Sequence, residues 1–322
     1  MVAEPPPSPL VIIGPTASGK SSLAVALGQR FDRVEIVSAD AMAVYRGMDV
    51  GTAKPTVAER CGLPHHLIDV VDPGEDYTVA RFGEEVAAVL ADIEARGGQA
   101  IVVGGTGLYV RAVVDAFSVP GQFPDVRAEL EAEPDTAALY RRVEALDPVA
   151  ATKMLPTNRR RIVRALEVTI GSGRPFSSFG PGVDHYGETR FRLAGLEIDR
   201  DEMDRRIDAR YSVQMADGFL DEVARLQRTG LSRTAGQALG YRELAAHLNG
   251  ETGLEEALDE ARKRTRKFAR RQQRWFRRDP RITWFPALAD DLVERVARWW
   301  QADPSPSGAA QAAPDESSGR GK

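Results

Sequence analysis

The sequence predicts an α/β fold built on a parallel sheet, and two observations support this prediction. Short apolar runs typical of buried strands alternate with longer segments of helical periodicity, as in a doubly wound sheet. The first run, Leu10 to Ile13, leads directly into a glycine-rich turn and then into a helical pattern that begins at Leu23. Strand, turn and helix in this order are the context of a phosphate-binding loop.

The turn matches the full pattern G-x-x-x-x-G-K-S/T. Backbone N–H groups in such a loop bind anionic oxygens, and the positive end of the helix dipole adds to the attraction. Lys20 supplies a point charge, and Ser21 offers a hydroxyl to Mg²⁺. The loop therefore predicts binding of a di- or triphosphate with Mg²⁺, but not the reaction. Its members are Gly14, Pro15, Thr16, Ala17, Ser18, Gly19, Lys20 and Ser21.

The remaining core elements follow in order. Val34 to Asp40 is a second strand, whose carboxyl end delivers Asp40 to the edge of the sheet where ligands bind. The polar connection at 41–55 is long for a compact domain, and such loops are usually functional. We further expect strands at 67–71, 100–109 (ending in a glycine-rich turn) and 192–198, and helices at 77–96, 201–228 (one or a pair), 254–278 and 293–300.

Changes in composition divide the chain into five segments. The prolines between 118 and 190 separate short helical stretches, and 171–187 has the composition of a loop, so this part predicts a helical insertion. The expected divisions are a disordered leader at 1–9, the first part of a P-loop NTPase-like core at 10–117, a helical insertion at 118–190, a second part of the core with C-terminal basic helices at 191–301, and a disordered tail at 302–322.

Composition excludes several classes of protein. With 322 residues, 43% hydrophobic and 28% charged, the chain has the composition of a soluble globular protein. A single cysteine, Cys61, excludes an intramolecular disulfide and a cysteine-rich zinc site. No run of about eighteen apolar residues and no signal peptide is present. We therefore expect a cytoplasmic monomer without a membrane partner.

The residues near the loop leave the chemistry open. Phosphoryl-transfer enzymes usually hold Mg²⁺ with a second carboxylate at the end of an apolar strand, but the strand from Ala100 ends in Gly104–Gly107. Asp40 suits a general base beside a diphosphate leaving group, and equally well a Mg²⁺ ligand or a helix cap. A small-molecule kinase acting on ATP remains the main alternative. A GTPase-like RNA-binding module is disfavoured, because no Asn/Thr-Lys-x-Asp motif for guanine is present.

Basic residues gather in two places, although the formal net charge is −4. One cluster covers 159–164, and the other occupies the helix at 254–278, where acids almost vanish after Arg262. Positions 263, 267, 270, 271, 274 and 278 fall near one helical face. This pattern favours binding of nucleic-acid phosphates over a merely solvated helix face.

Six stretches together resemble the bacterial tRNA dimethylallyltransferases, also called tRNA isopentenyltransferases. The resemblance extends over about residues 10 to 285, and its stretches are 14–21, 38–40, 45–55, 64–69, 103–109 and 240–243. It implies transfer of a dimethylallyl group from dimethylallyl diphosphate to the exocyclic amine of the adenosine immediately 3′ of the anticodon (position 37), with release of diphosphate. Ala41 and Ala43 depart from the family pattern, which commonly has serine and glutamine there.

The resemblance also implies roles for individual residues. Asp40 would take the proton of the amine, Thr106 would lie near the reacting centre, and Arg210 would hold the diphosphate. Thr16 and Ser21 would contact phosphate or metal. The partner would be a tRNA anticodon stem-loop, contacted by Asp40, Ala41, Met42, Ala43, Thr106, Arg127, Arg160, Arg161, Arg164, Gln237, Gly240, Tyr241 and Arg242.

Overall fold

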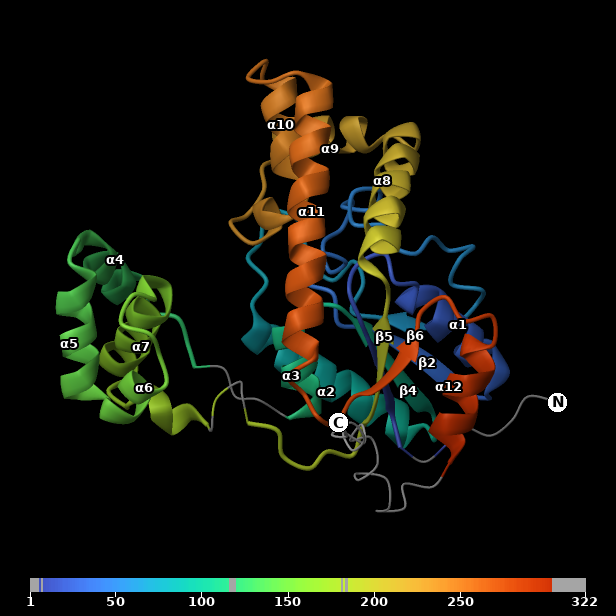
Figure 1. Cartoon of the computed structure of the whole chain (residues 1–322), viewed down its shortest axis with the longest axis horizontal. Helices are drawn as coiled ribbons and strands as arrows, with labels where there is room; N and C mark the ends of the chain where they lie inside the picture. The colour runs from blue at the N-terminus through green and yellow to red at the C-terminus, as the bar shows by residue number, and fades with distance from the viewer. Residues whose placement is uncertain (1–5, 7, 116–119, 181, 183–184, 303–322) are drawn as a thin grey trace, which may run out of the picture.

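The computed structural model describes residues 6, 8–115, 120–180, 182 and 185–302 (Figure 1). Most of the expected leader at 1–9 and nearly all of the expected tail at 302–322 lie outside these residues. The same holds for 116–119, where we expect the core to give way to the insertion. None of the described helices is both long enough and apolar enough to cross a membrane.

The core is a sheet of six parallel strands in the order β3-β2-β4-β1-β5-β6, which confirms the predicted fold class. The register places the carboxyl ends of the three central strands together, because Ile13 pairs with Gly104 and Ser38 pairs with Val103. The strands are β1 (Leu10–Ile13), β2 (Val34–Ser38), β3 (His65–His66), β4 (Gln99–Gly104), β5 (Arg192–Glu197) and β6 (Thr283–Pro286).

Helices cover both faces of the sheet (Figure 1). On one face, α1 (Lys20–Arg30) and α12 (Leu292–Gln301) pack on the strands through a cluster that includes Leu27 and Trp300. On the other face, α2 (Val79–Ala95) and α3 (Gly107–Val114) enclose a larger cluster around Phe82 and Tyr109. The two rings are stacked with centroids 4.1 Å apart.

A group of helices projects beyond the sheet toward the upper part of Figure 1. It consists of α8 (Arg200–Ala216), α9 (Phe219–Thr229), the short 3-10 turn η2 (Ala235–Gln237), α10 (Tyr241–Leu248) and α11 (Leu254–Phe276). The predicted element at 201–228 is therefore a pair of helices, separated at Gly218, whose φ is 91°. The long helix α11 descends from this group to the region of α3.

Four helices between β4 and β5 pack around a separate core. They are α4 (Pro124–Ala132), α5 (Thr136–Leu146), α6 (Pro148–Thr152) and α7 (Arg159–Ser172), and the 3-10 turn η1 (Phe176–Phe179) follows them. Figure 1 shows these helices as a group set to one side of the sheet. Asp135, Asp147 and Asn158 are the N-cap residues of α5, α6 and α7. The side chain of each accepts a hydrogen bond from a backbone N–H in the first turn of its helix.

Several local predictions were wrong. The strand expected at 67–71 does not form, because Leu67 and Asp69 have φ of 59° and 58°, and the only strand there is β3. The stretch expected as strand and turn at 100–109 already contains the start of α3. Helix α10 and strand β6 were not predicted, and the expected loop at 171–187 contains the end of α7 and the turn η1.

A substitution at Gly104 would show how closely β2 and β4 approach each other at the carboxyl edge of the sheet. A Cβ at this position would lie 2.3 Å from the carbonyl oxygen of Ala39, whose backbone cannot move aside cheaply. We expect Gly104→Ala to lower the free energy of unfolding by about 1–3 kcal/mol in urea denaturation. The control Gly83→Ala, whose Cβ would meet only Ala112 at 4.0 Å in a helix, should be neutral or stabilising by up to ~1 kcal/mol. Equal effects would contradict the tight contact.

Candidate active site

The phosphate loop has the predicted strand–turn–helix context. It leaves β1 after Ile13 and enters α1 at Lys20, with left-handed backbone at Ala17 (φ 65°) and Gly19 (φ 85°). No side chain caps α1, and its first turn contains no acid. The Oγ of Ser18 is buried and has no hydrogen-bond partner among the described residues. Uncapped N–H groups and an unpartnered buried hydroxyl are what an anionic ligand would satisfy.

Two cations line this loop. The Nζ of Lys20 donates a hydrogen bond of 2.6 Å to the carbonyl of Pro15, and Arg210 on α8 donates one of 3.0 Å to the Oγ1 of Thr16. Burial lowers the pKa of Lys20 to about 8, against the opposing effect of Asp40. Burial also lowers the pKa of Arg210, again opposed by Asp40. Both groups are therefore short of counter-charge, which a diphosphate would supply.

Asp40 and Thr106 stand at the same edge of the sheet, at the ends of β2 and β4. One oxygen of Asp40, Oδ1, accepts the N–H of Met42 at 2.8 Å, so the carboxylate also closes a local turn. The Oγ1 of Thr106 accepts the N–H of Ala41 at 3.3 Å. Asp40 acts on the charges of both Lys20 and Arg210, so the predicted base and the two cations lie near one another.

The site offers few protein ligands for a metal ion. No group of three or more His, Cys, Asp and Glu side chains that could hold one is found in the described part of the chain. Ser21 is exposed at the start of α1, and Asp40 follows β2 at the edge of the sheet where the loop lies. Mg²⁺ commonly keeps several waters and binds through substrate phosphates with one or two protein groups. These residues fit that mode and do not fit an all-protein cage.

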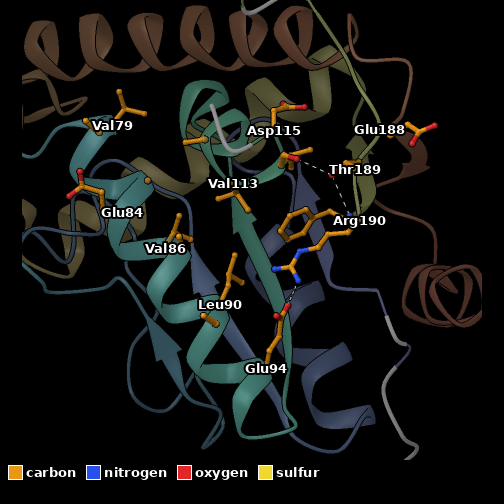
Figure 2. Close-up of a pocket in the computed structure, with 17 residues that line it drawn as sticks. Val79, Glu84, Val86, Leu90, Glu94, Val113, Asp115, Glu188, Thr189 and Arg190 are labelled. Atoms are coloured by element: carbon orange, nitrogen blue, oxygen red, sulfur yellow. Dashed lines mark hydrogen bonds and ion pairs between the residues drawn. The ribbon is translucent and has the colours of Figure 1, made fainter. Parts of the chain in front are cut away.

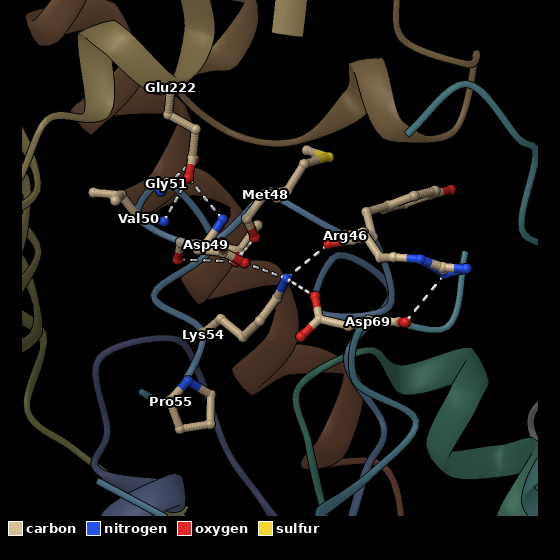
Figure 3. A network of polar contacts seen from close by, with 12 residues as sticks. Arg46, Met48, Asp49, Val50, Gly51, Lys54, Pro55, Asp69 and Glu222 are labelled. Carbon is tan, nitrogen blue, oxygen red and sulfur yellow. Dashed lines mark hydrogen bonds and ion pairs between the residues drawn. The ribbon is translucent and has the colours of Figure 1, made fainter. Parts of the chain in front are cut away.

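The connection at 41–55 is fixed by a buried lysine that the sequence did not reveal (Figure 3). The Nζ of Lys54 donates to the carbonyl of Tyr45 at 2.7 Å and to the carboxylates of Asp49 at 2.5 Å and Asp69 at 2.6 Å. Its side chain is only 3% exposed, so these contacts replace its hydration. They also hold the segment around Asp69 out of the expected strand.

Glu222 on α9 holds the next part of this connection (Figure 3). Its carboxylate accepts the N–H groups of Asp49, Val50 and Gly51 at 2.8–3.0 Å and the hydroxyl of Tyr241 at 2.7 Å. The following carbonyl, of Thr52, accepts a second hydrogen bond of 3.0 Å from Arg210. A sequence signal existed, since Glu222 lies among Phe219, Val223 and Leu226 on the apolar face of its helix.

Most of the expected tRNA contacts fall into two groups. Arg160, Gln237 and Arg242 are exposed, and Arg161 is partly exposed. By contrast, the side chain of Tyr241 is buried against Phe219, and Gly240 and Ala43 are buried as well. The aromatic ring of Tyr241 therefore belongs to the support of the 49–52 backbone and is not on a surface open to RNA.

Two of the expected arginine contacts are already engaged inside the protein. Arg164 donates to the carbonyls of Pro120 and Gly121 at 2.6 and 3.0 Å, and it pairs with the buried Glu167 at 2.9 Å. Arg127 pairs with the same Glu167 at 3.3 Å. These bonds tie the entry of the insertion to α7, so any contact of either arginine with RNA would compete with them.

The basic helix α11 has two kinds of cationic side chain. Arg266 and Arg270 pair with Asp208 and Asp204 of α8, so Arg270, although it falls near the predicted face, is engaged within the protein. The other predicted positions are exposed and recur every three or four residues along one side. We call these five the basic stripe, and they are Lys263, Lys267, Arg271 and Arg274 on α11 and Arg278 just past its end.

A groove elsewhere on the molecule is not part of this constellation. It lies between α2, α3 and the segment at 188–191, near the place where the chain leaves and re-enters the core (Figure 2). Its walls are mostly apolar, with Val86, Leu90 and Val113, and the ion pair of Glu94 with Arg190 lies at one end. None of the phosphate-loop residues lines it.

Comparison with known proteins gives a consistent result. The family model described as IPP transferase matches residues 43–279. A tRNA dimethylallyltransferase of Nocardioides sp. is 48% identical over 307 residues, which cover 92% of this chain and 98% of that protein. One of Kineococcus radiotolerans is 49% identical over 306 residues, covering 90% and 96%.

Solved structures agree with these relatives. The tRNA isopentenylpyrophosphate transferase of Bacillus halodurans superposes with a TM-score of 0.67 at 36% identity, covering 91% of this chain and 95% of that one. A eukaryotic dimethylallyltransferase solved acting on tRNA gives a TM-score of 0.75 at 26% identity, covering 90% and 77%. Both the sequence and the fold therefore place the chain in the IPP transferase family.

Proposed function

We propose that this protein transfers a dimethylallyl group from dimethylallyl diphosphate to the exocyclic amine of the tRNA adenosine immediately 3′ of the anticodon. The product is N6-dimethylallyladenosine, and diphosphate leaves. One observation supports this most directly: the carboxylate of Asp40 acts on both cations that line the phosphate loop, Lys20 and Arg210, while β4 ends in Gly104 without an acid. That arrangement suits a departing diphosphate better than a phosphoryl group to be passed on.

In this mechanism the diphosphate lies in the loop of residues 14–21, against Lys20 and Arg210. The amine nitrogen attacks the allylic carbon, the carbon–oxygen bond to the diphosphate breaks, and Asp40 accepts the amine proton. The two cations stabilise the negative charge that develops on the leaving group, because they are in place before the reaction. Thr106 orients the reacting centre from the end of β4. When bound, Mg²⁺ would neutralise diphosphate charge, with Ser21 as the protein hydroxyl beside it.

The tRNA partner requires a surface for phosphates and an accessible base. Anticodon loops are single-stranded, so their bases unstack at low cost and can enter a protein site. The basic stripe on α11 and the exposed side chains of Arg160, Gln237 and Arg242 supply contacts of the required kind. We propose that the insertion at 118–190 and α11 both hold the anticodon stem-loop, and that the protein works as a cytoplasmic monomer.

The decisive experiment incubates the protein with labelled dimethylallyl diphosphate, Mg²⁺ and unmodified tRNA. Label should enter the tRNA as N6-dimethylallyladenosine. Asp40→Asn keeps the acceptor for the N–H of Met42 but is a poor base, so we expect turnover to fall about 10²–10⁴-fold while tRNA affinity stays within about threefold. In a parallel incubation with ATP, phosphate transfer together with unlabelled tRNA in the first reaction would instead support a kinase. Full activity of the variant would remove Asp40 as the base.

Lys20 should couple diphosphate binding to proton uptake. Its pKa of about 8 leaves it half neutral at that pH in the free protein, and a bound anion favours the charged form. Titration calorimetry with inorganic diphosphate, in buffers of different ionisation enthalpy, should show uptake near pH 8 and weaker binding above it. In Lys20→Arg the side chain is charged at every pH tested, so the proton uptake that Lys20 contributes on diphosphate binding should vanish. Identical uptake in both proteins would contradict the lowered pKa.

The basic stripe should bind tRNA phosphates. We expect the double variant Lys267→Glu/Arg271→Glu to weaken tRNA binding at least tenfold and to make the dependence of log K on log salt concentration shallower by about one unit or more. The control Arg295→Glu/Arg298→Glu reverses the same charge on exposed positions of α12, which covers a different face. Filter binding at several salt concentrations measures both. Equal losses would indicate a general charge effect and not a contact surface.

A further inference from the structure

Gln272 joins the two halves of the candidate site. It lies on α11, and its side-chain amide is buried between the phosphate loop and the turn after β4. Its Oε1 accepts the N–H of Thr16 at 2.9 Å, and its Nε2 donates to the carbonyl of Gly105 at 2.8 Å. Both groups of the amide are thus used, each with a partner that admits only one orientation of the side chain.

The residues on either side of this bridge are those to which we assign the chemistry. Thr16 accepts the hydrogen bond from Arg210, on the side of the leaving group. Gly105 precedes Thr106, which accepts the N–H of Ala41 next to Asp40, on the side of the base. The distance from the diphosphate cradle to the base therefore depends on how firmly loop and turn are held together.

The approach of Gln272 to the turn is unusually close. A Cβ at Gly105 would lie 2.3 Å from Nε2 of Gln272, and one at Gly107 would lie 2.2 Å from Nε1 of Trp275 on the same helix. Both glycines thus leave room for α11. The helix is anchored on either side of the amide by Ala269 and Phe276, which are buried. The amide is consequently presented by a rigid element and not by a loop.

We propose that Gln272 is a positioning residue for the prenyl transfer, which sets the spacing between the diphosphate cradle and the Asp40–Thr106 edge. The inference rests on the proposed function. A displacement of about 1 Å between reacting groups can cost a hundredfold in rate, so loss of the bridge should lower turnover more than stability. Substrate tRNA should bind as before, because the basic stripe lies on the exposed side of α11.

The neighbouring Gln273 offers a matched control. Gln273 lies on the same helix and is partly buried. Its Nε2 donates a 3.1 Å hydrogen bond to the carbonyl of Ile198, away from the loop and the turn. Gln272→Met and Gln273→Met have the same change in chemistry and nearly the same volume. We expect kcat to fall at least tenfold in Gln272→Met and less than twofold in Gln273→Met, with the KM for tRNA within twofold of wild type in both.

A third variant separates positioning from packing. In Gln272→Glu a protonated carboxyl group can make both bonds, but a carboxylate cannot donate to the carbonyl of Gly105 and repels the diphosphate. Its turnover relative to the wild type should therefore rise as the pH falls, whereas the ratio for Gln272→Met should stay flat. If Gln272 served packing alone, Gln272→Met would keep wild-type turnover at every pH, and only the repulsion in Gln272→Glu would change with pH.

Binding of inorganic diphosphate, measured by calorimetry, keeps this test apart from the proposed function. We expect the affinity to fall about fivefold or more in Gln272→Met and to be unchanged in Gln273→Met. If the wild type fails to prenylate tRNA, the proposed function is wrong. The diphosphate titration then still shows whether Gln272 is needed to hold the phosphate loop in its binding geometry. Equal turnover and equal diphosphate affinity in the two methionine variants would overturn the positioning role.

Discussion

The parallel register of the three central strands is the constraint on which the site depends. Since β1, β2 and β4 end at the same edge, the strand register alone brings the phosphate loop, Asp40 and Thr106 out side by side. Parallel strands concentrate ligand sites at this edge in general. Here the close approach of Gly104 to the backbone of Ala39 sets how near the strand ends come to each other.

The helices beyond the sheet complete the site with groups that the sheet cannot supply. Helix α8 contributes Arg210, α9 contributes Glu222, and α11 contributes Gln272. All three bind backbone groups: Arg210 the carbonyl of Thr52, Glu222 three N–H groups, and Gln272 the N–H of Thr16 and the carbonyl of Gly105. Buried polar groups of this kind order a connection that has little regular structure of its own.

Helix α11 also shows how a charged sequence can serve two purposes. Arg266 and Arg270 face α8 and pair with its acids, so these two positive charges are neutralised by ion pairs within the protein. The basic stripe lies opposite the buried face of the helix and remains exposed, in a chain whose formal net charge is −4. An RNA partner would therefore meet a local patch of positive charge and not a basic protein, which favours contact at one defined face.

The sequence by itself determined the features that are local or periodic. The phosphate loop is contiguous, apolar runs marked most of the strands, and the end of the second strand identified Asp40. Only the tertiary structure decided the rest. Gln272 meets Thr16 across 256 positions, and Glu222 meets Asp49 across 173, separations at which no pattern in the chain specifies a hydrogen bond. The same holds for Lys54, whose ion pair with Asp69 replaced an expected strand, because a buried charge must find its partners wherever the fold brings them.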